Sequence, residues 1–533
     1  MLKQISCDIF LESPIDFHKG LNVILGDNKA SNSIGKSSLL MIIDFIFGGN
    51  SYIDKNSDVI TNIREHQFLF CFEFDNTMYY FKRSTDEYKY VHICDDKYNT
   101  IEKVRVEKYT EFLKEKYKID NDSITFRGIV SLYSRIWQKG NFDVKKPLHE
   151  LSAKNYKHAI INLIKLFNKY SKIRELENEI KELEDSKKAV QKAEKYHYIP
   201  KVNKSTYNKN KKEIDRIKKE IEKVALAISM DYNRFAEKLD TELSDQINAL
   251  KRQKSNYELQ LRRIRRNKIR DKITNAKQFE TLLEFFPDVN MNKINEIEKF
   301  HMSLVNVLKD EIEKSESEII SKLKTIDSNI TKLELDFSKK VEQVPDSEFV
   351  RPLLELSSQL NQKENENSLY EKKASILEDI KDVKEQLGKV KTTILFELSN
   401  LINKEIASIN ERIHKDGRRP PQIILLENMY HFGVEDNTGT GEAYTSLIEF
   451  DLSVLKLTKL PFIIHDSMMF KNVENDVIDE IINIYNEQTK QIFIAIDEKN
   501  KFNKRTQNII EKNKVINLSE NKLLFIKDWR KNK

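Results

Sequence analysis

Glycine is scarce in this chain, and its distribution divides the sequence. The 533 residues contain only 12 glycines, and between Gly140 and Gly417 the single one is Gly388. Both tryptophans, Trp137 and Trp529, also lie outside that interval. A long stretch dense in Lys, Glu, Leu and Ile and nearly free of turn residues is typical of long helices. We expect the two ends of the chain, which hold the glycines, to be globular.

Cysteine and long apolar runs are also scarce. The three cysteines, Cys7, Cys71 and Cys94, are too few for a metal cluster or a disulfide framework, and they fit a reducing compartment. The longest apolar run, near residue 40, is broken by Asp44 and is too short to span a bilayer. The first residues lack signal-peptide features. We therefore expect a soluble cytoplasmic protein without a membrane partner, whose net charge of +6 says little about nucleic acid.

The glycine-poor interval carries heptad spacing. Apolar residues recur at alternating intervals of three and four over 173–183, 214–228, 319–337 and 380–394. This period is typical of coiled coils, in which an apolar seam faces a partner helix. A compact helical bundle would give a similar composition, but sustained heptads with charged flanks favour a coil.

Prolines interrupt the heptads and suggest where the coil turns. Phe285-Phe286-Pro287-Asp288 lies near the middle of the helical interval, and further breaks fall at Pro200 and Pro345. We predict an antiparallel coiled coil over 161–412 with its apex near 272–300. Globular segments over 1–160 and 413–533 would flank it.

Gly35-Lys36-Ser37 is the strongest local motif. Apolar runs from Leu21 to Leu25 and from Leu39 to Phe47 flank it and predict a strand and a helix. A strand, Gly-Lys-Ser and a helix form the context of a phosphate-binding P-loop. Lys36 would reach the β- and γ-phosphates, and the Ser37 hydroxyl would bind Mg²⁺. The residues expected to bind the nucleotide are Asn32, Ser33, Ile34, Gly35, Lys36, Ser37 and Ser38.

The spacing of this loop departs from the usual GxxxxGK[ST] pattern. Ala30 stands where the first glycine would fall, and Gly26 lies nine residues before Gly35. This spacing indicates an insertion in the loop. We expect Lys36 to be exposed on that loop and to support no core. A chance Gly-Lys-Ser in a lysine-rich chain is the alternative interpretation.

Three other segments carry candidate site residues. Gln138 follows the N-terminal globular part, and Gly439-Thr440-Gly441-Glu442 precedes a helix predicted over 444–457. The apolar run 461–465 ends in Asp466, and the run 491–496 ends in Asp497 and Glu498. Both runs predict buried strands. Elsewhere, we predict a hairpin over 67–81, a helix over 102–118 and a last strand over 522–526.

The order of these motifs resembles that of SMC-type ABC ATPases, the branch that includes RecF and RecN. The closest resemblance is to an uncharacterised family of SMC-like coiled-coil proteins in bacterial ABC three-component defence systems. The residues that carry it are Asn32 to Ser37, Phe126-Arg127, Glu298 to His301, Gly439 to Gly441, and Phe462 to Ser467. The resemblance implies an α/β ABC-type ATPase head, split into N- and C-terminal lobes by the long antiparallel coiled coil.

The resemblance also implies roles for residues. Asp466 would be the Walker B carboxylate that holds Mg²⁺, and Gln138 would sense Mg²⁺ and the γ-phosphate. Gly439, Thr440 and Gly441 would form the signature that contacts ATP bound to a second copy. The metal ligands would then be Ser37, Asp466 and Gln138. His465 would be a structural strand-end histidine.

Two residues compete for the role of catalytic base within this resemblance. Ser467 stands where SMC-type ATPases carry a glutamate, and a serine hydroxyl is a poor base at neutral pH. Glu498 is the other candidate, because 494–498 also looks like a Walker B strand with its glutamate. We expect an ATPase whose basal hydrolysis of ATP is slow.

The resemblance predicts partners as well as ligands. ATP and Mg²⁺ would drive dimerisation of the heads, and DNA and proteins of the same defence system would be further partners. The stretch 251–272 is strongly basic and would contact an acidic partner or be a solvated coil face. The alternatives are a RecN-type DNA-repair ATPase and a coiled-coil scaffold with a vestigial nucleotide site.

Overall fold

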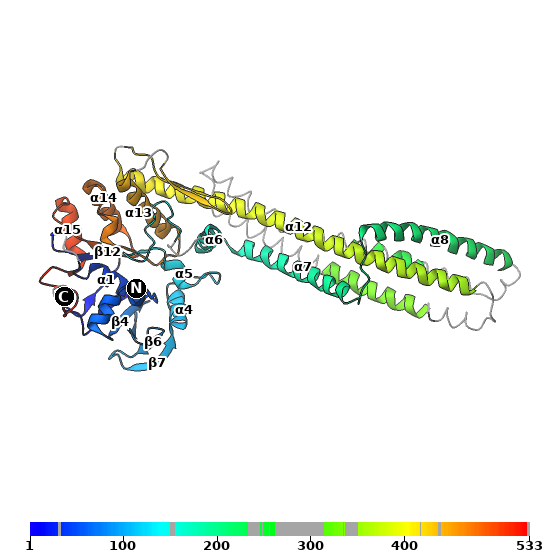
Figure 1. Ribbon diagram of the computed structural model, residues 1–533, viewed down its shortest axis with the longest axis horizontal. Coiled ribbons are helices and arrows are strands. Elements are labelled where there is room, and N and C mark those ends of the chain that lie inside the picture. Colours follow the sequence, from blue (N-terminus) through cyan, green and yellow to red (C-terminus); the bar gives the residue numbers. More distant parts are fainter. Residues whose placement is uncertain are drawn as a thin grey trace. The chain divides into compact units, whose positions relative to one another are not determined.

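The chain forms two compact units, residues 1–189 with 376–533 and residues 190–375. The computed structural model describes residues 1–29, 33–149, 155–232, 246–247, 249–254, 256–258, 260–261, 314–333, 335, 350–415, 417–434 and 439–529. Both ends of the chain lie in the first unit (Figure 1). Parts of two long helices pack with the core of this unit, and the domain boundaries near 160 and 412 stay a prediction.

A sheet of five parallel strands from both ends of the chain lies at the centre of the first unit. Its order is β13 (Lys514–Asn517), β3 (Leu21–Leu25), β12 (Gln491–Ile496), β11 (Phe462–His465) and β8 (Ser134–Arg135). All four pairings are parallel. β3, β11 and β12 are buried along their whole length, as continuous apolar strands of a parallel sheet should be. Their carboxyl ends meet at one edge.

A second sheet of six antiparallel strands lies in the same unit. Its order is β2 (Ile15–Asp16), β1 (Leu2–Ser6), β4 (Gln67–Phe74), β5 (Thr77–Ser84), β6 (Tyr90–Cys94) and β7 (Thr100–Arg105). The hairpin of β4 and β5 confirms the prediction over 67–81. A separate hairpin joins β9 (Gln422–Leu425) to β10 (Tyr430–Gly433).

Two sequence predictions about these segments are wrong. The predicted helix over 102–118 begins only at Val106, because residues 100–105 pair with β6 along its whole length. The predicted strand over 522–526 forms only isolated bridges, such as Phe10 with Phe525. That segment instead contacts the loop after β3, as described below.

The helices of the first unit surround and extend these sheets. Near the site lie α1 (Lys36–Ile46), α13 (Thr440–Leu457), the 3-10 turn η1 (Ser467–Met469), α14 (Asn475–Glu487) and α15 (Lys504–Lys512). The shorter helices are α2 (Ser51–Lys55), α3 (Ser57–Ile63), α4 (Val106–Lys116), α5 (Phe126–Val130) and α6 (Tyr156–Leu166). Two long helices, α7 (Ser171–Lys195) and α12 (Val350–Ile413), have residues in both units, and α8 (Lys204–Tyr232) belongs to the second unit. None of the described helices is long and apolar enough to cross a membrane.

The long helices pair antiparallel. In the first unit, Lys391 lies 3.1 Å from Glu177 and Lys384 lies 2.8 Å from Glu184, so residue numbers fall on α12 as they rise on α7. The second unit continues this order. There the Tyr207 hydroxyl donates to Glu371 of α12 at 2.9 Å, and the Asn210 amide donates to Glu366 at 2.7 Å. The predicted apex near 272–300 lies outside the described residues.

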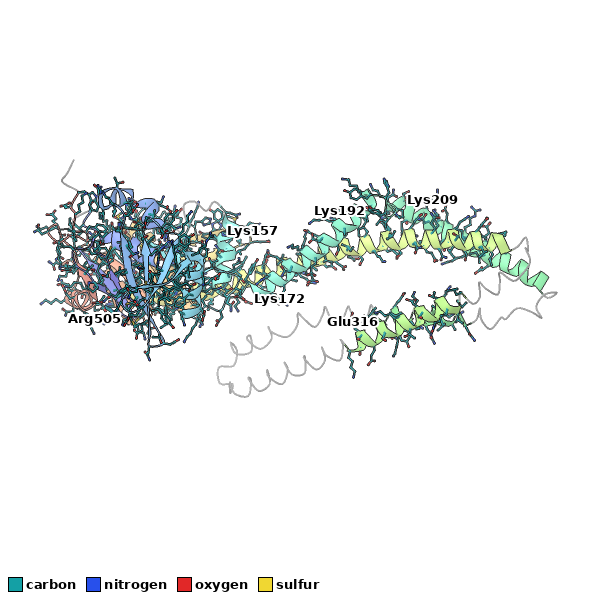
Figure 2. The ribbon with its side chains drawn as sticks, turned by 90° about the horizontal axis from the view of Figure 1, so that it is seen from below. Lys157, Lys172, Lys192, Lys209, Glu316 and Arg505 are labelled. Atoms are coloured by element: carbon teal, nitrogen blue, oxygen red, sulfur yellow. The ribbon has the colours of Figure 1, made fainter. Side chains whose placement is uncertain are left out.

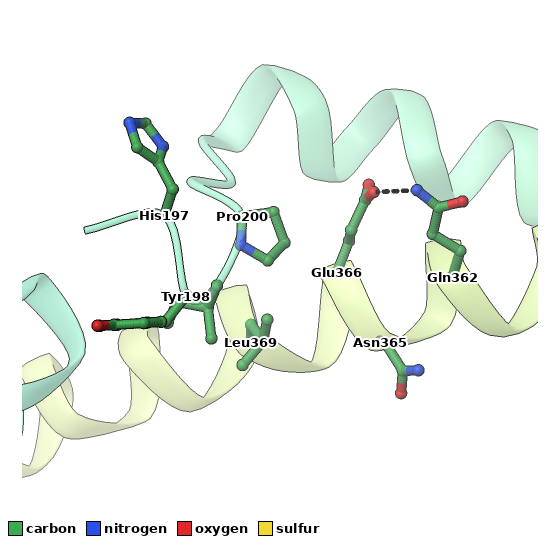
Figure 3. A pocket seen from close by; sticks show the side chains of 8 residues that line it. His197, Tyr198, Pro200, Gln362, Asn365, Glu366 and Leu369 are labelled. Atoms are coloured by element: carbon green, nitrogen blue, oxygen red, sulfur yellow. Dashed lines mark hydrogen bonds between the residues drawn. The ribbon is translucent and has the colours of Figure 1, made fainter. Parts of the chain in front are cut away.

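A joint separates α7 from α8. Residues 196–203 leave the helix at the predicted break around Pro200. His197, Tyr198 and Pro200 line a hollow there together with Leu369 of α12 (Figure 3). Lys192 and Lys209 flank the joint with exposed side chains (Figure 2).

A buried carboxyl joins α13 to the last turns of α12 within the first unit. Glu449 is fully buried, and its Oε1 accepts a hydrogen bond of 3.1 Å from the Asn410 amide. Burial raises the pKa of Glu449 from 4.5 to about 8. The folded protein therefore holds a proton here that the unfolded chain releases.

Glu449→Gln should change how stability depends on pH. Between about pH 4.5 and about pH 8 the folded state binds the extra proton, so wild-type stability should fall as the pH rises through this window. The Gln variant should lack that part of the fall, because its amide resembles the protonated acid. Urea unfolding midpoints measured across the window check this, with the exposed Glu427→Gln as control. Identical pH profiles for wild type and Glu449→Gln would contradict the assignment.

Candidate functional site

The first half of the loop after β3 is fixed by the end of β12. The Gly26 N–H donates to the Ile496 carbonyl at 2.8 Å, and the Lys499 N–H donates to the Asn28 side chain at 2.9 Å. A Cβ at Gly26 would lie 2.6 Å from the Asp497 carbonyl oxygen. The backbones approach so closely that only glycine fits there. The loop is therefore held across the sheet before it reaches α1.

The second half of the loop has the backbone of an anion-binding nest. Ser33 has φ 57° and Gly35 has φ 104°, with buried Ile34 between them. Gly35 is the N-cap of α1 and makes no side-chain cap hydrogen bond to the N–H groups of the first turn. N–H groups arranged in this way bind phosphate oxygens. The predicted ligand Asn32 lies outside the described residues.

The C-terminal segment supports this nest from below. The Leu524 N–H donates to the Ile34 carbonyl at 3.1 Å. A Cβ at Gly35 would lie 2.4 Å from the Cβ of Leu524. Glycine is thus required by both its positive φ and its close packing. Residues 522–526 therefore contact the loop before α1 and do not form the predicted strand.

Lys36 is buried, contrary to the expectation that it lies exposed on a loop. It is the first residue of α1 and only 8 % exposed, and its Nζ lies 3.2 Å from Oδ1 of Asp497. The position follows from the sheet order, because β12 is the neighbour of β3 and ends beside the start of α1. The ammonium therefore lies at the carboxyl edge of the sheet, paired with a carboxylate.

Asp466 lies at the same edge, directly after β11. It is fully buried, and its Oδ2 accepts a hydrogen bond of 3.0 Å from the Trp137 N–H. Its Oδ1 is buried and has no hydrogen-bond partner among the described residues. Burial raises the pKa of Asp466, and the Trp137 N–H and the Ser37 hydroxyl offset that rise only in part.

This arrangement fits a hard divalent cation. Mg²⁺ in nucleotide sites takes one or two protein oxygens together with phosphate and water. The Ser37 hydroxyl lies near Asp466 and helps to lower its pKa. Oδ1 of Asp466 has no hydrogen-bond partner among the described residues, so Ser37 and Asp466 can each supply one oxygen ligand. An unpartnered buried carboxylate oxygen is otherwise costly. The residues at this edge thus fit Mg²⁺ with a phosphate ligand.

Gln138 lies one residue beyond the backbone contact to Asp466. It is exposed and has φ 73°. The structure therefore brings its segment to Asp466 and leaves its side chain exposed to solvent. Ser38, on the first turn of α1, is half-buried.

Asp497 is a site residue that sequence reasoning did not select. The sequence offered Glu498 instead, yet Asp497 makes the ion pair with Lys36. The half-buried Glu498 side chain makes no hydrogen bond or ion pair with the residues that the structure describes. Its position could have identified Asp497, because it is the first residue after a buried strand of the parallel sheet.

The proposed signature residues open α13. Gly439 and Thr440 are exposed at its start, and a Cβ at Gly441 would lie 2.4 Å from the Asn472 carbonyl oxygen. Gly441 is therefore needed for packing whatever else it does. The contacts of Gly441 are with the segment after η1, so this end of α13 remains available at the surface through Thr440.

A buried polar network supports the strands of the site. Arg135 on β8 forms a bidentate pair with Asp451 of α13, at 2.9 and 2.8 Å. His465 lies 3.1 Å from the same carboxylate and 2.6 Å from the Tyr485 hydroxyl. Burial lowers the pKa of His465, so it is neutral and satisfied, in line with a structural role.

Comparisons with known proteins show similarity at low sequence identity. A family described as an uncharacterised protein conserved in bacteria (DUF2326) matches residues 399–527. No curated protein matches the sequence significantly. A solved Smc head domain with a coiled coil and joint from Pyrococcus yayanosii aligns at 13 % identity and TM-score 0.43, covering 93 % of this chain and 92 % of that one.

Another solved structure is similar at the same level. The Smc head domain with an extended coiled coil from Pyrococcus furiosus, bound to the C-terminal domain of ScpA, aligns at 13 % identity and TM-score 0.40. The alignment covers 96 % of this chain and 91 % of that chain. At such TM-scores, the fold assignment depends on the strand order and loop geometry of this chain itself.

Lys36→Ala should weaken ATP binding strongly. Lys36 would give charge-assisted hydrogen bonds to phosphate, each worth about 1.5–3 kcal/mol, which is about 10- to 100-fold in affinity. Calorimetry with ATP and Mg²⁺ measures this. Asp497→Asn is the control, because it removes the same ion pair but keeps the ammonium, and it should bind ATP at least as tightly as wild type. Undiminished binding by Lys36→Ala would remove the P-loop assignment.

Proposed function

We propose that this protein is an ATP- and Mg²⁺-dependent switch of the ABC ATPase type, with its nucleotide site at the carboxyl edge of the parallel sheet. The observation that carries the proposal is the buried Oδ1 of Asp466 beside the first turn of α1, which has no hydrogen-bond partner among the residues that the structure describes. That turn begins with Lys36 and Ser37 and follows a left-handed glycine. The N–H groups that can bind phosphate, the Lys36 ammonium and the Asp466 carboxylate thus lie at the same edge of the sheet.

Each residue of this edge has a defined task in the proposal. The N–H groups of the first turn of α1 would bind phosphate oxygens, and Lys36 would leave Asp497 to reach the β- and γ-phosphates. Ser37 and Asp466 would hold Mg²⁺, which neutralises phosphate charge when bound. Gln138 would approach the γ-phosphate from its exposed loop.

Pairing of two copies would complete the site. Thr440 and Gly439 are exposed at the start of α13, where N–H groups and a helix dipole favour an anion. In a head-to-head dimer this helix end would meet the γ-phosphate bound by the other copy. Contacts to bound ATP would then hold the two heads together, and hydrolysis would release them.

Finer roles follow from the motif order alone. A part in DNA-linked bacterial defence together with partner proteins belongs to the proposal, with a RecN-type repair ATPase as alternative. Most of the basic stretch 251–272 lies outside the described residues, and Lys254 in its described part pairs with Asp327 at 2.6 Å. At that position, the interpretation as a solvated coil face is favoured over contact with an acidic partner.

A scaffold with a vestigial nucleotide site is the second candidate function. The observation that favours it is the Lys36–Asp497 ion pair, which neutralises the ammonium that a phosphate needs. ATP binding that depends on Lys36 separates the two candidates.

Basal hydrolysis should be slow. Ser467 follows Asp466, and loss of a general base costs roughly 10²–10⁴ in rate, against turnover numbers of about 10 s⁻¹ in typical enzymes. Single-turnover hydrolysis of the full-length protein measures this. Asp466→Asn, which can keep the Trp137 hydrogen bond, should abolish Mg²⁺-dependent hydrolysis. A fast wild-type rate that collapses in Glu498→Gln would show that Glu498 is the base in place.

Thr440→Trp should block ATP-driven dimerisation while leaving ATP binding intact. The side chain is exposed at the proposed interface, so an indole there obstructs the partner head without disturbing the core. Gly441 is unsuitable for this test, because any side chain would collide with Asn472. Light scattering with ATP and Mg²⁺ reports the dimer. A Thr440→Trp protein that dimerises like wild type would remove this end of α13 from the interface.

A further inference from the structure

Two contacts connect the neighbours of Gln138 to the elements of the candidate site. On one side, the Trp137 N–H binds Oδ2 of Asp466 at 3.0 Å. On the other side, Nζ of Lys139 lies 3.2 Å from Oδ1 of Asp44, which belongs to α1. Gln138 lies between these anchors and is exposed. Both neighbours of Gln138 are thus tied to elements that carry the nucleotide site.

The second anchor is buried and charged. The Lys139 side chain is 5 % exposed and that of Asp44 is fully buried. Burial raises the pKa of Asp44, but Arg127 and Lys139 outweigh it and bring the pKa below its usual range. A buried pair of this kind is strongly destabilised when one partner is removed. The ammonium of Lys139 also donates to the Ser131 carbonyl at 3.2 Å, so it is held between Asp44 of α1 and the residue after α5.

The anchor connects two parts of one site. Asp44 lies eight residues after Lys36 on the same helix, about 12 Å along its axis. A helix transmits a displacement of its first turn to its later turns as a rigid body. Whatever moves Lys36 and Ser37 therefore also moves the point to which Lys139 is fixed.

We propose that Lys139 and Asp44 are positioning residues that make the Gln138 loop follow the P-loop helix. The proposal deepens the nucleotide-switch function above and rests on it. Gln138 and Gly140 both have a left-handed backbone, with φ 73° and 75°, in this short segment. Without the Lys139–Asp44 pair, the segment would keep the Trp137 contact and the hydrogen bond from the Lys139 N–H to the Ile136 carbonyl, but it would lose its connection to α1, and the Gln138 amide would no longer follow that helix.

Arg127 provides a matched comparison. Its guanidinium also contacts Oδ1 of Asp44, at 2.9 Å, but it comes from α5 and not from the Gln138 loop. Arg127→Met and Lys139→Met each remove one cation from the same carboxylate and leave the other. A merely structural role of the Asp44 cluster predicts the same outcome for both variants. A positioning role predicts an effect on the loop only for Lys139.

Trp137 can report the loop directly. The chain has two tryptophans, and Trp529 packs on Phe525 at the other end of the chain. In full-length Trp529→Phe protein, fluorescence and acrylamide quenching therefore report the half-exposed Trp137 alone. Lys139→Met should raise the quenching without nucleotide, Lys139→Arg should restore it towards the parent value, and Arg127→Met should leave it unchanged.

Kinetics provide the second readout. In the same background, Lys139→Met should lower the single-turnover rate, on the order of 10²-fold for a misplaced group, while ATP affinity stays close to that of the parent. Unchanged quenching and rate in Lys139→Met would overturn the proposal, as would equal effects of Arg127→Met. If the parent protein bound no ATP, the nucleotide-switch function would fail, and the quenching comparison would still test the anchor.

Discussion

The parallel register of the central sheet is the constraint on which the site depends. β3, β11 and β12 run in one direction, so Asp466 and Asp497 emerge at the edge where the loop after β3 turns into α1. The hydrogen bonds that pair the strands are made whatever the loop contains. The loop then has little freedom, because Gly26 contacts the end of β12 and Gly35 contacts Leu524. The sheet thus orders residues that are far apart in the sequence.

The partners of the buried carboxylates differ between the candidate site and the residues that support it. Asp44 and Asp451 are fully buried, and each lies against a guanidinium that brings its carboxyl pKa below the usual value. Asp466 is equally buried but has no such partner, and burial raises its pKa. A fold that gives two buried carboxylates a cationic partner, and gives the third none among the described residues, has a place for a cation. The pair of Arg135 and Asp451 also stabilises the fold, because it joins β8 to α13.

The helical part follows simpler rules. Heptads fix which faces of α7 and α12 meet, and charged pairs beside the seam fix their antiparallel register. The break at Pro200 changes the partner of α12 from α7 to α8 without changing this order. Each exposed pair contributes little energy, so the apolar seam holds the helices together and the charges select the register.

The sequence by itself determined the long helices, the buried strands and the Gly-Lys-Ser turn, because their periodicity and flanks are local properties. It also pointed to Asp466, since a carboxylate directly after an apolar run lies at a strand end. Only the tertiary structure decided that Lys36 is buried against Asp497, and that residues 100–105 and 522–526 serve other neighbours. These outcomes depend on which strands are adjacent in the sheet. Strand order is set by packing between distant segments, and no local pattern of residues records it.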